Sequence, residues 1–178
     1  LKSEFGFSEN DYFVGSFQRD TEGHDLVSPK LIKGPDIFFE IVKEIYKNNK
    51  NMKVVLTGKR RGYLINKFKE SDIPYVYFEM ASFTDLNKLY NLLDLYVVSS
   101  RIEGGPQAIL ECGISKTPIV STDVGVSSEI LAAESIFDPK NFLKAKPNVD
   151  YAYKKSLEFA IPKGVEKFNV MLRSLHES

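Results

Sequence analysis

The stretch Ser99–Gly125, SSRIEGGPQAILECGISKTPIVSTDVG, joins two apolar segments through a glycine-rich turn and decides the fold. Gly104 and Gly105 leave the backbone without side chains, and Pro106 presets the first turn of a helix. We therefore predict a helix from about Pro106 to Ser115 and a strand over TPIVST after it. Because LYVVSS just before the turn also has the composition of a strand, the whole unit predicts strand, turn, helix and strand.

The same alternation continues through the rest of the chain. Segments rich in β-branched and aromatic residues predict strands at Tyr12 to Phe17, MKVVLTG, PYVYFE, LYVVSS, TPIVST and a short edge strand SIF. Apolar residues at helical spacing predict helices at DIFFEIVKEIYKNN, RGYLINKFKES, TDLNKLYNLLD with Thr84 as N-cap, Pro106 to Ser115, SSEIL, PKNFLKA with Asp138 as cap, and two in a tail broken at Pro162.

Strands that are apolar on both faces and alternate with helices predict a parallel sheet covered on both sides. We therefore expect an α/β fold, a Rossmann-like doubly wound parallel sheet of about six strands with helices on both faces. The 178 residues suffice for a single domain with one well-buried core. Because the chain begins at Leu1 rather than at a methionine, we expect it to be part of a longer polypeptide with a further domain.

The composition limits the classes of partner. The 24 basic residues balance the 24 acidic ones, so no global field favours nucleic acid or an anionic membrane. The single cysteine, Cys112, excludes an internal disulfide and a multi-cysteine zinc site, and it fits a reducing compartment. The longest apolar runs are about six residues, whereas a membrane span needs ~20. We expect a cytoplasmic protein that does not bind nucleic acid.

Two glutamates flank the glycine-rich turn. Free amides at a helix start and the positive end of its dipole attract a phosphate. Glu111 lies about 7 Å along the axis beyond Pro106, at ~1.5 Å per residue, which is too deep to cap the helix. We interpret Glu111 as an acceptor for a pair of sugar hydroxyls. The alternative is that Glu103 only accepts hydrogen bonds within its own loop and that Glu111 is an ordinary solvated helix residue.

The E-x7-E pattern from Glu103 to Glu111, with EGGP inside it, LLDLYVVSS before it and GISKTPIVSTDVG after it, resembles the donor-binding half of a family 4 glycosyltransferase with the GT-B fold. The resemblance also includes FVGSFQR, KGPDIF and VVLTG, and so covers about residues 12 to 131. It implies a retaining transferase that moves a hexose from a nucleoside diphosphate sugar, such as a UDP-sugar, in polysaccharide biosynthesis.

The resemblance further implies that an absent N-terminal domain binds the sugar, glycan or lipid-linked acceptor. The present chain would then bind donor weakly and be inactive alone. A peripheral association of the full-length enzyme with a membrane stays open.

The resemblance also implies roles for individual residues. Arg19 and Lys33 match the cations that contact the donor diphosphate in this family. Glu103 matches the catalytic glutamate that orients the transferred sugar, and Glu111 matches the one that binds the ribose hydroxyls. Loops at the carboxyl ends of the strands supply the other expected donor-binding residues: Ser16, Gly58, Lys59, Met80, Ser82, Gly104, Gly105, Pro106 and Gln107.

Two features depart from the family pattern. Thirteen residues separate Arg19 from Lys33, far more than in relatives, and they include Lys30 as an alternative diphosphate contact. We prefer Lys33 because it directly precedes Gly34 and a helix. The loop expected to hold the base begins with Glu-Met where a glycine is common, so the base is not assigned.

The expected chemistry needs no cofactor. Breaking a sugar–phosphate bond leaves extra negative charge on the nucleoside diphosphate, which two cations and helix-start amides stabilise. We therefore predict a metal-independent reaction, and the sequence contains no Asp-x-Asp motif at a strand end.

Other readings of the same residues stay open. Three hypotheses fit the basic residues of GKRRGY: they extend the phosphate site, they face an anionic acceptor, or they lie in solvent. A sugar-nucleotide epimerase or a phosphorylase on the same fold would use a related diphosphate site. A non-catalytic α/β module of the response-regulator kind would need an acidic cluster at the first strand and a phosphorylatable aspartate at the end of the third, and Phe17 and Glu79 occupy those regions instead.

Overall fold

A computed structural model describes residues 1–176, which form a five-stranded parallel sheet in the order β3-β2-β1-β4-β5. The strands are β1 (Tyr12–Ser16), β2 (Met52–Thr57), β3 (Tyr75–Phe78), β4 (Leu95–Val98) and β5 (Ile119–Ser121). This arrangement confirms the predicted doubly wound α/β fold. The expected sixth strand is reduced to an isolated bridge between Ser121 and Ile136, because a 3₁₀ turn, η3 (Ala133–Ser135), ends directly before it.

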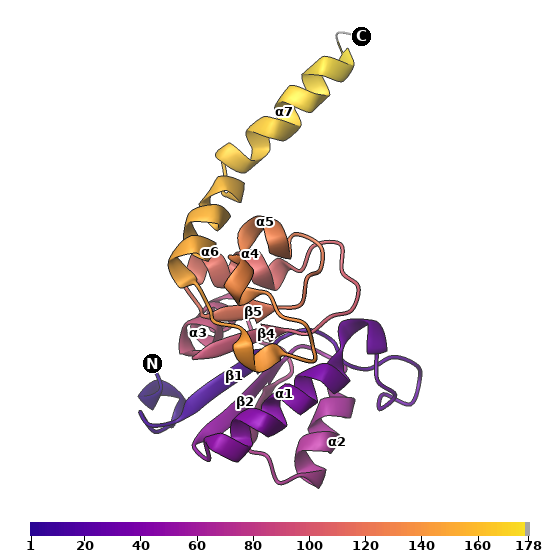
Figure 1. The fold of residues 1–178 in the computed structure, drawn as a ribbon, viewed down its shortest axis with the longest axis vertical. Coiled ribbons are helices and arrows are strands. Elements are labelled where there is room, and N and C mark those ends of the chain that lie inside the picture. Colours follow the sequence, from indigo (N-terminus) through magenta and orange to yellow (C-terminus); the bar gives the residue numbers. More distant parts are fainter. Residues whose placement is uncertain (177–178) are drawn as a thin grey trace.

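Helices cover both faces of the sheet (Figure 1). The α-helices are α1 (Pro35–Asn48), α2 (Gly62–Glu70), α3 (Phe83–Leu92), α4 (Gln107–Ser115), α5 (Ser127–Ile130), α6 (Val149–Ser156) and α7 (Lys163–His176). Four more short 3₁₀ turns are η1 (Ser3–Phe5), η2 (Leu31–Lys33), η4 (Phe142–Lys144) and η5 (Leu157–Phe159). The predicted helix at PKNFLKA is only η4, and Asp138 accepts a hydrogen bond from the Lys140 amide instead of capping a helix.

Each strand contributes to two separate cores. Phe13 packs with α3, α4, α5 and α6, whereas its neighbour Val14 packs with α1 and α2. Val55 and Val54 divide in the same way, and all four side chains are fully buried. This division follows from the two-residue period of a strand. Because both faces of the sheet are closed, a ligand must approach it at an edge.

Ser82 caps α3 in place of the predicted Thr84. The Ser82 hydroxyl accepts a hydrogen bond from the Asp85 amide at 3.1 Å, since the helix begins at Phe83. We expect Ser82→Ala to lower the free energy of unfolding by about 1 kcal/mol, as loss of an N-cap does. Thr84→Ala should change it by less than ~0.5 kcal/mol. Urea denaturation of both variants checks this, and equal losses would contradict the assignment of the cap.

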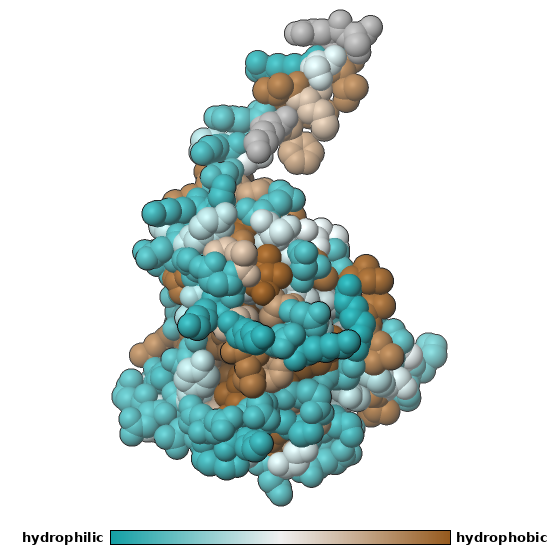
Figure 2. Space-filling view, viewed as in Figure 1, coloured by the Kyte–Doolittle hydropathy of each residue, from teal (hydrophilic) through white to brown (hydrophobic). Residues whose placement is uncertain are grey.

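The C-terminal tail extends away from the sheet (Figure 1). The predicted break at Pro162 is confirmed, because η5 ends before this residue and α7 begins after it. Figure 2 shows apolar side chains along the projecting helix. Phe168, Val170 and Met171 of α7 are exposed. No helix within residues 1–176 is both long and apolar enough to cross a membrane.

Candidate functional site

The chain changes winding direction between β1 and β4. From β1 it proceeds outward to β2 and β3, and it then returns to place β4 on the other side of β1, where Val14 aligns with Leu95. The loops that leave β1 and β4 therefore diverge at the carboxyl edge of the sheet. Such a switch point is where open α/β sheets bind ligands.

A cavity of about 260 Å³ lies at this switch point. Its lining residues come from the segment after β1, the end of η2, helix α3, strand β4, the loop after β4 and the start of α4. The lining residues are Phe17, Gln18, Lys33, Tyr90, Tyr96, Val98, Glu103, Gly105, Pro106, Gln107, Ala108 and Glu111. Six of the residues expected from the sequence to bind the donor thus share one cavity.

Lys33 and Glu103 form an ion pair in this cavity. Lys33 Nζ donates to Glu103 Oε1, and the two side chains are 24% and 13% exposed. Ser100 Oγ lies 3.0 Å from the same carboxylate oxygen. Partial burial weakens the competition from water, so the pair is stronger than a pair on an open surface.

Close packing of two loops places Lys33 beside Glu103. Gly34 has a φ of 62°, and a Cβ there would lie 1.8 Å from the Ser99 carbonyl oxygen. Only glycine fits this backbone conformation and this approach. Gln18 adds a second connection, because its Nε2 donates to the Lys33 carbonyl at 2.8 Å.

The start of α4 is open to the cavity. Pro106 occupies the N-cap position, and within the described part of the chain no side chain caps this end of the helix. The first amides of a helix have no partner in the helix itself, and the dipole places positive potential there. Because Gln107 and Ala108 line the cavity, this helix start can receive an anion there.

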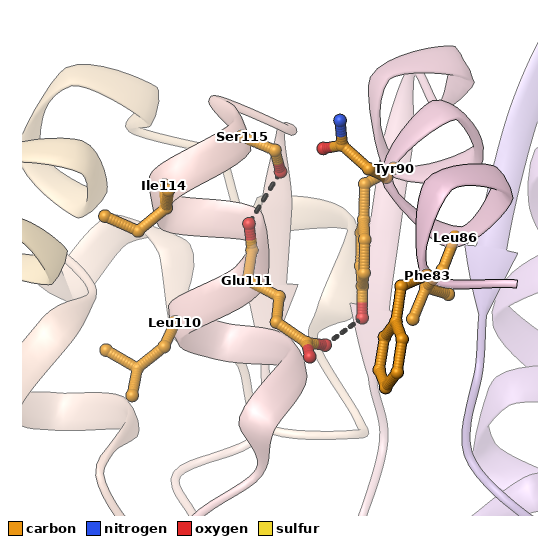
Figure 3. A pocket seen from close by; sticks show the side chains of 8 residues that line it. Phe83, Leu86, Tyr90, Leu110, Glu111, Ile114 and Ser115 are labelled. Carbon is orange, nitrogen blue, oxygen red and sulfur yellow. Dashed lines mark hydrogen bonds between the residues drawn. The ribbon is translucent and has the colours of Figure 1, made fainter. Parts of the chain in front are cut away.

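Glu111 lies one turn into α4, and its carboxylate faces α3. Its Oε2 accepts a hydrogen bond from the Tyr90 hydroxyl at 2.5 Å (Figure 3). The Tyr90 ring is buried against the rings of Phe17 and Tyr96, with centroids 4.9 and 5.7 Å away. Burial raises the pKa of the Tyr90 phenol far above its ordinary value, so this group stays protonated and can donate.

Residues 13–151 match the family model described as glycosyl transferases group 1. The chain belongs to this family. No curated protein matches the chain.

Solved structures share the fold of this group 1 domain. A TarM variant from S. aureus, in complex with Fondaparinux, alpha-GlcNAc-glycerol and UDP, is 16% identical with a TM-score of 0.68; the match covers 97% of this chain and 37% of that one. HepE from Anabaena, in complex with UDP and glucose, is 16% identical with a TM-score of 0.71; the match covers 98% and 51%. The chain therefore spans about a third to a half of these two structures.

A shorter structure matches over most of its own length. It is the C-terminal domain of the glycosyl transferase group 1 family protein LpcC from Francisella tularensis, at 21% identity and a TM-score of 0.65. The match covers 84% of this chain and 87% of that one. At these identities the three likenesses show the fold alone.

The remaining residues expected to bind the donor lie outside the cavity lining of the group 1 domain. Arg19 is exposed, and its Nε donates to the Thr21 carbonyl at 2.8 Å. Lys59 and Met80 are exposed on loops at the same edge of the sheet. The others are Ser16, which is buried at the end of β1, Gly58, Ser82 and Gly104. Their role in binding stays a prediction.

A buried ion pair anchors the long loop after β1 in the group 1 domain. Arg61 Nε lies 2.9 Å from Asp20 Oδ2, and the two side chains are 0% and 2% exposed. Arg61 Nη1 also donates to the Gln18 carbonyl. Burial raises the pKa of Asp20 to about 6, and the charge of Arg61 opposes this rise. Arg61 is therefore buried and does not line the cavity. Its partner Asp20 lies 41 positions earlier in the chain, so the sequence around Arg61 does not indicate this ion pair.

The sequence interpretation missed Gln18, Tyr90, Tyr96 and Ser100 as parts of the site. The helical spacing of Tyr90 with Leu86, Leu89 and Leu93 indicated a core residue, and its ring is indeed buried. Its hydroxyl reaches Glu111 from a different helix, and no sequence spacing reports such a contact. The pattern of α3 alone therefore could not have identified it.

Proposed function

We propose that this domain binds a nucleoside diphosphate sugar and forms the donor half of a retaining family 4 hexosyltransferase. One observation carries the proposal: Lys33, Glu103 and Glu111 share a single cavity with the uncapped start of α4. A cation and free amides suit a diphosphate, and two carboxylates suit the hydroxyls of its two sugars.

The diphosphate would lie at the start of α4 beside Lys33. Negative charge develops there as the sugar–phosphate bond breaks, and amides that are already oriented stabilise it without reorganisation. Arg19 would supply a second positive charge by exchanging its contact with the Thr21 carbonyl for a phosphate oxygen. With these groups in place the reaction would need no metal ion.

The two glutamates would hold the sugars. Glu103 would orient the hexose at the reacting carbon, and Glu111 would accept hydrogen bonds from the ribose. Retention would follow from attack on the same face that the diphosphate leaves, with the departing phosphate taking the proton of the acceptor. The acceptor would bind mainly to a further domain of the full-length enzyme. The UDP in the TarM and HepE complexes supports UDP as the nucleotide.

Titration calorimetry with UDP, GDP and ADP tests the proposal. We expect at least one nucleotide to bind with a dissociation constant below ~1 mM, corresponding to about −4 kcal/mol. Glu111→Ala should weaken this binding about 10-fold, because a charge-assisted hydrogen bond contributes ~1.5 kcal/mol or more. Glu40→Ala, which removes an exposed glutamate on α1, is the matched control.

Two results would contradict the proposal. One is that all three nucleotides fail to bind at millimolar concentration. The other concerns the full-length enzyme, where product analysis should find free nucleoside diphosphate and a glycoside. An isomerised donor would instead indicate an epimerase.

A further inference from the structure

Tyr90 connects the two helices that border the cavity. It belongs to α3, and its hydroxyl crosses to Glu111 Oε2 on α4 at 2.5 Å. Beyond this contact, the groove between the helices continues as a second hollow of about 420 Å³ (Figure 3). Tyr90 and Glu111 line both hollows, so they stand at the junction between them.

The Tyr90 ring is held in place from several sides. Phe17 and Tyr96 pack against it, and the Tyr96 hydroxyl in turn accepts a hydrogen bond from the Phe17 amide at 2.9 Å. The Thr117 hydroxyl donates to the Tyr90 carbonyl at 2.8 Å. The hydroxyl of Tyr90 therefore occupies a fixed point at the edge of a packed aromatic cluster.

Glu111, by contrast, is an exposed residue on a helix surface. Among the described side chains, no cation pairs with its carboxylate, and Ser115 contacts only its backbone carbonyl. A glutamate without a fixed partner samples several rotamers, and binding must then pay for its ordering. The hydroxyl of Tyr90 removes this freedom and leaves Glu111 Oε1 open toward a ligand.

We propose that Tyr90 is a positioning residue that holds Glu111 in the orientation that accepts the ribose hydroxyls, and that this contact discriminates ribonucleotides from 2′-deoxyribonucleotides. The inference rests on the proposed function. A carboxylate with one oxygen fixed presents the other at a defined angle to the neighbouring hydroxyls of a ribose. A 2′-deoxyribose lacks one of these hydroxyls and therefore forms one hydrogen bond fewer with the oriented carboxylate of Glu111.

Titration calorimetry of the present chain with UDP and 2′-deoxy-UDP tests the inference. We expect the wild-type domain to prefer UDP about 10-fold, the value of one hydrogen bond to a charged group. Tyr90→Phe should weaken UDP binding about 5-fold and 2′-deoxy-UDP binding less than 2-fold, since only the positioning hydrogen bond is removed. The preference for UDP should therefore fall from about 10-fold to about 2- to 4-fold.

Two controls separate positioning from a structural effect. Tyr46→Phe removes a tyrosine hydroxyl from α1, on the opposite face of the sheet, and should leave both affinities unchanged. Glu111→Ala should remove the preference by itself, and adding Tyr90→Phe to it should have no further effect on the ratio of the two affinities. Tyr90→Phe keeps the buried ring, and a thermal unfolding midpoint close to that of the wild type would show that its core is intact.

The possible outcomes distinguish a failure of the positioning role of Tyr90 from a failure of the proposed function. Equal weakening of both nucleotides by Tyr90→Phe, or an unchanged preference in this variant, overturns the positioning role. A wild-type domain that binds UDP and 2′-deoxy-UDP equally overturns it as well and leaves nucleotide binding standing. A wild-type domain that binds neither these nor GDP or ADP overturns the proposed function itself.

Discussion

Replacing Arg61 by methionine is expected to lower the free energy of unfolding by about 3–5 kcal/mol, the loss typical when one partner of a buried ion pair is removed. Asp20 and Arg61 are 2% and 0% exposed, and their Oδ2 and Nε atoms lie 2.9 Å apart. Methionine fills much of the volume but leaves the carboxylate of Asp20 buried without a counter-charge. Urea denaturation at pH 7 measures the loss.

The exposed pair of Lys67 and Glu70 on α2 provides the matched control. Lys67→Met removes a cation from the same helix, where the Lys67 side chain is 38% exposed. Such pairs contribute at most ~0.5 kcal/mol, so the loss should be small. A loss below ~1 kcal/mol in Arg61→Met would contradict the burial of the pair.

The decrease in the free energy of unfolding caused by Arg61→Met should also depend on pH. Burial raises the pKa of folded Asp20 from 3.8 to about 6, so between these values the folded form holds a proton that the unfolded chain has released. Stability therefore falls as pH rises through this window. Arg61 lowers the pKa of Asp20, so in its absence the fall continues above pH 6. The difference between the two proteins should be larger at pH 7 than at pH 5.

The effect of Arg61→Met should extend to the cavity. Arg61 Nη1 donates to the Gln18 carbonyl, and the Gln18 side chain donates to the Lys33 carbonyl. Loss of Arg61 therefore loosens the loop that places Lys33 beside Glu103. Weaker binding of nucleoside diphosphate should accompany the loss of stability in this variant.

The fold followed from the sequence because each of its signals is local. Apolar runs, helical spacing and turn residues lie within a few positions of one another and need no knowledge of the distant chain. The errors arose where local signals compete. Ser82 and Thr84 are both good N-caps, and the hydrogen bond from the Asp85 amide decides for Ser82. The SIF segment has strand composition but forms a single bridge at Ile136.

The part of the candidate cavity that one local motif supplies also followed from the sequence. Glu103, Gly105, Pro106, Gln107 and Glu111 lie within one short motif, so a single strand–turn–helix unit places them together. Arg19 and Lys33 are separated by a long loop, and only Lys33 lines the cavity. The route of that loop depends on the buried Asp20–Arg61 pair, which no local pattern shows. Local sequence patterns do not indicate which residues from elements distant in sequence come into contact.

Lys33→Met and Glu103→Gln are expected to change nucleotide affinity in opposite directions. In the structure Lys33 Nζ donates to Glu103 Oε1, so a diphosphate must compete with this carboxylate for the same cation. Lys33→Met should weaken UDP binding by about 10- to 100-fold, because it removes a charge-assisted hydrogen bond worth ~1.5–3 kcal/mol. Glu103→Gln should strengthen UDP binding a few-fold, since it removes both the competitor and a negative charge near the phosphates.

Measurements of kcat should distinguish the role of Glu103 in turnover from the role of Lys33 in nucleotide binding. In the full-length enzyme Glu103→Gln should lower kcat by about 100-fold or more, because the group that we propose orients the sugar in the transition state is altered while the nucleotide binds more tightly. Lys30→Met tests the alternative lysine, which lies outside the cavity lining, and should leave UDP affinity unchanged. Calorimetry and steady-state kinetics measure these effects. If Lys33→Met and Glu103→Gln weakened UDP binding equally, the pair would support the loops structurally and would not compete with the ligand.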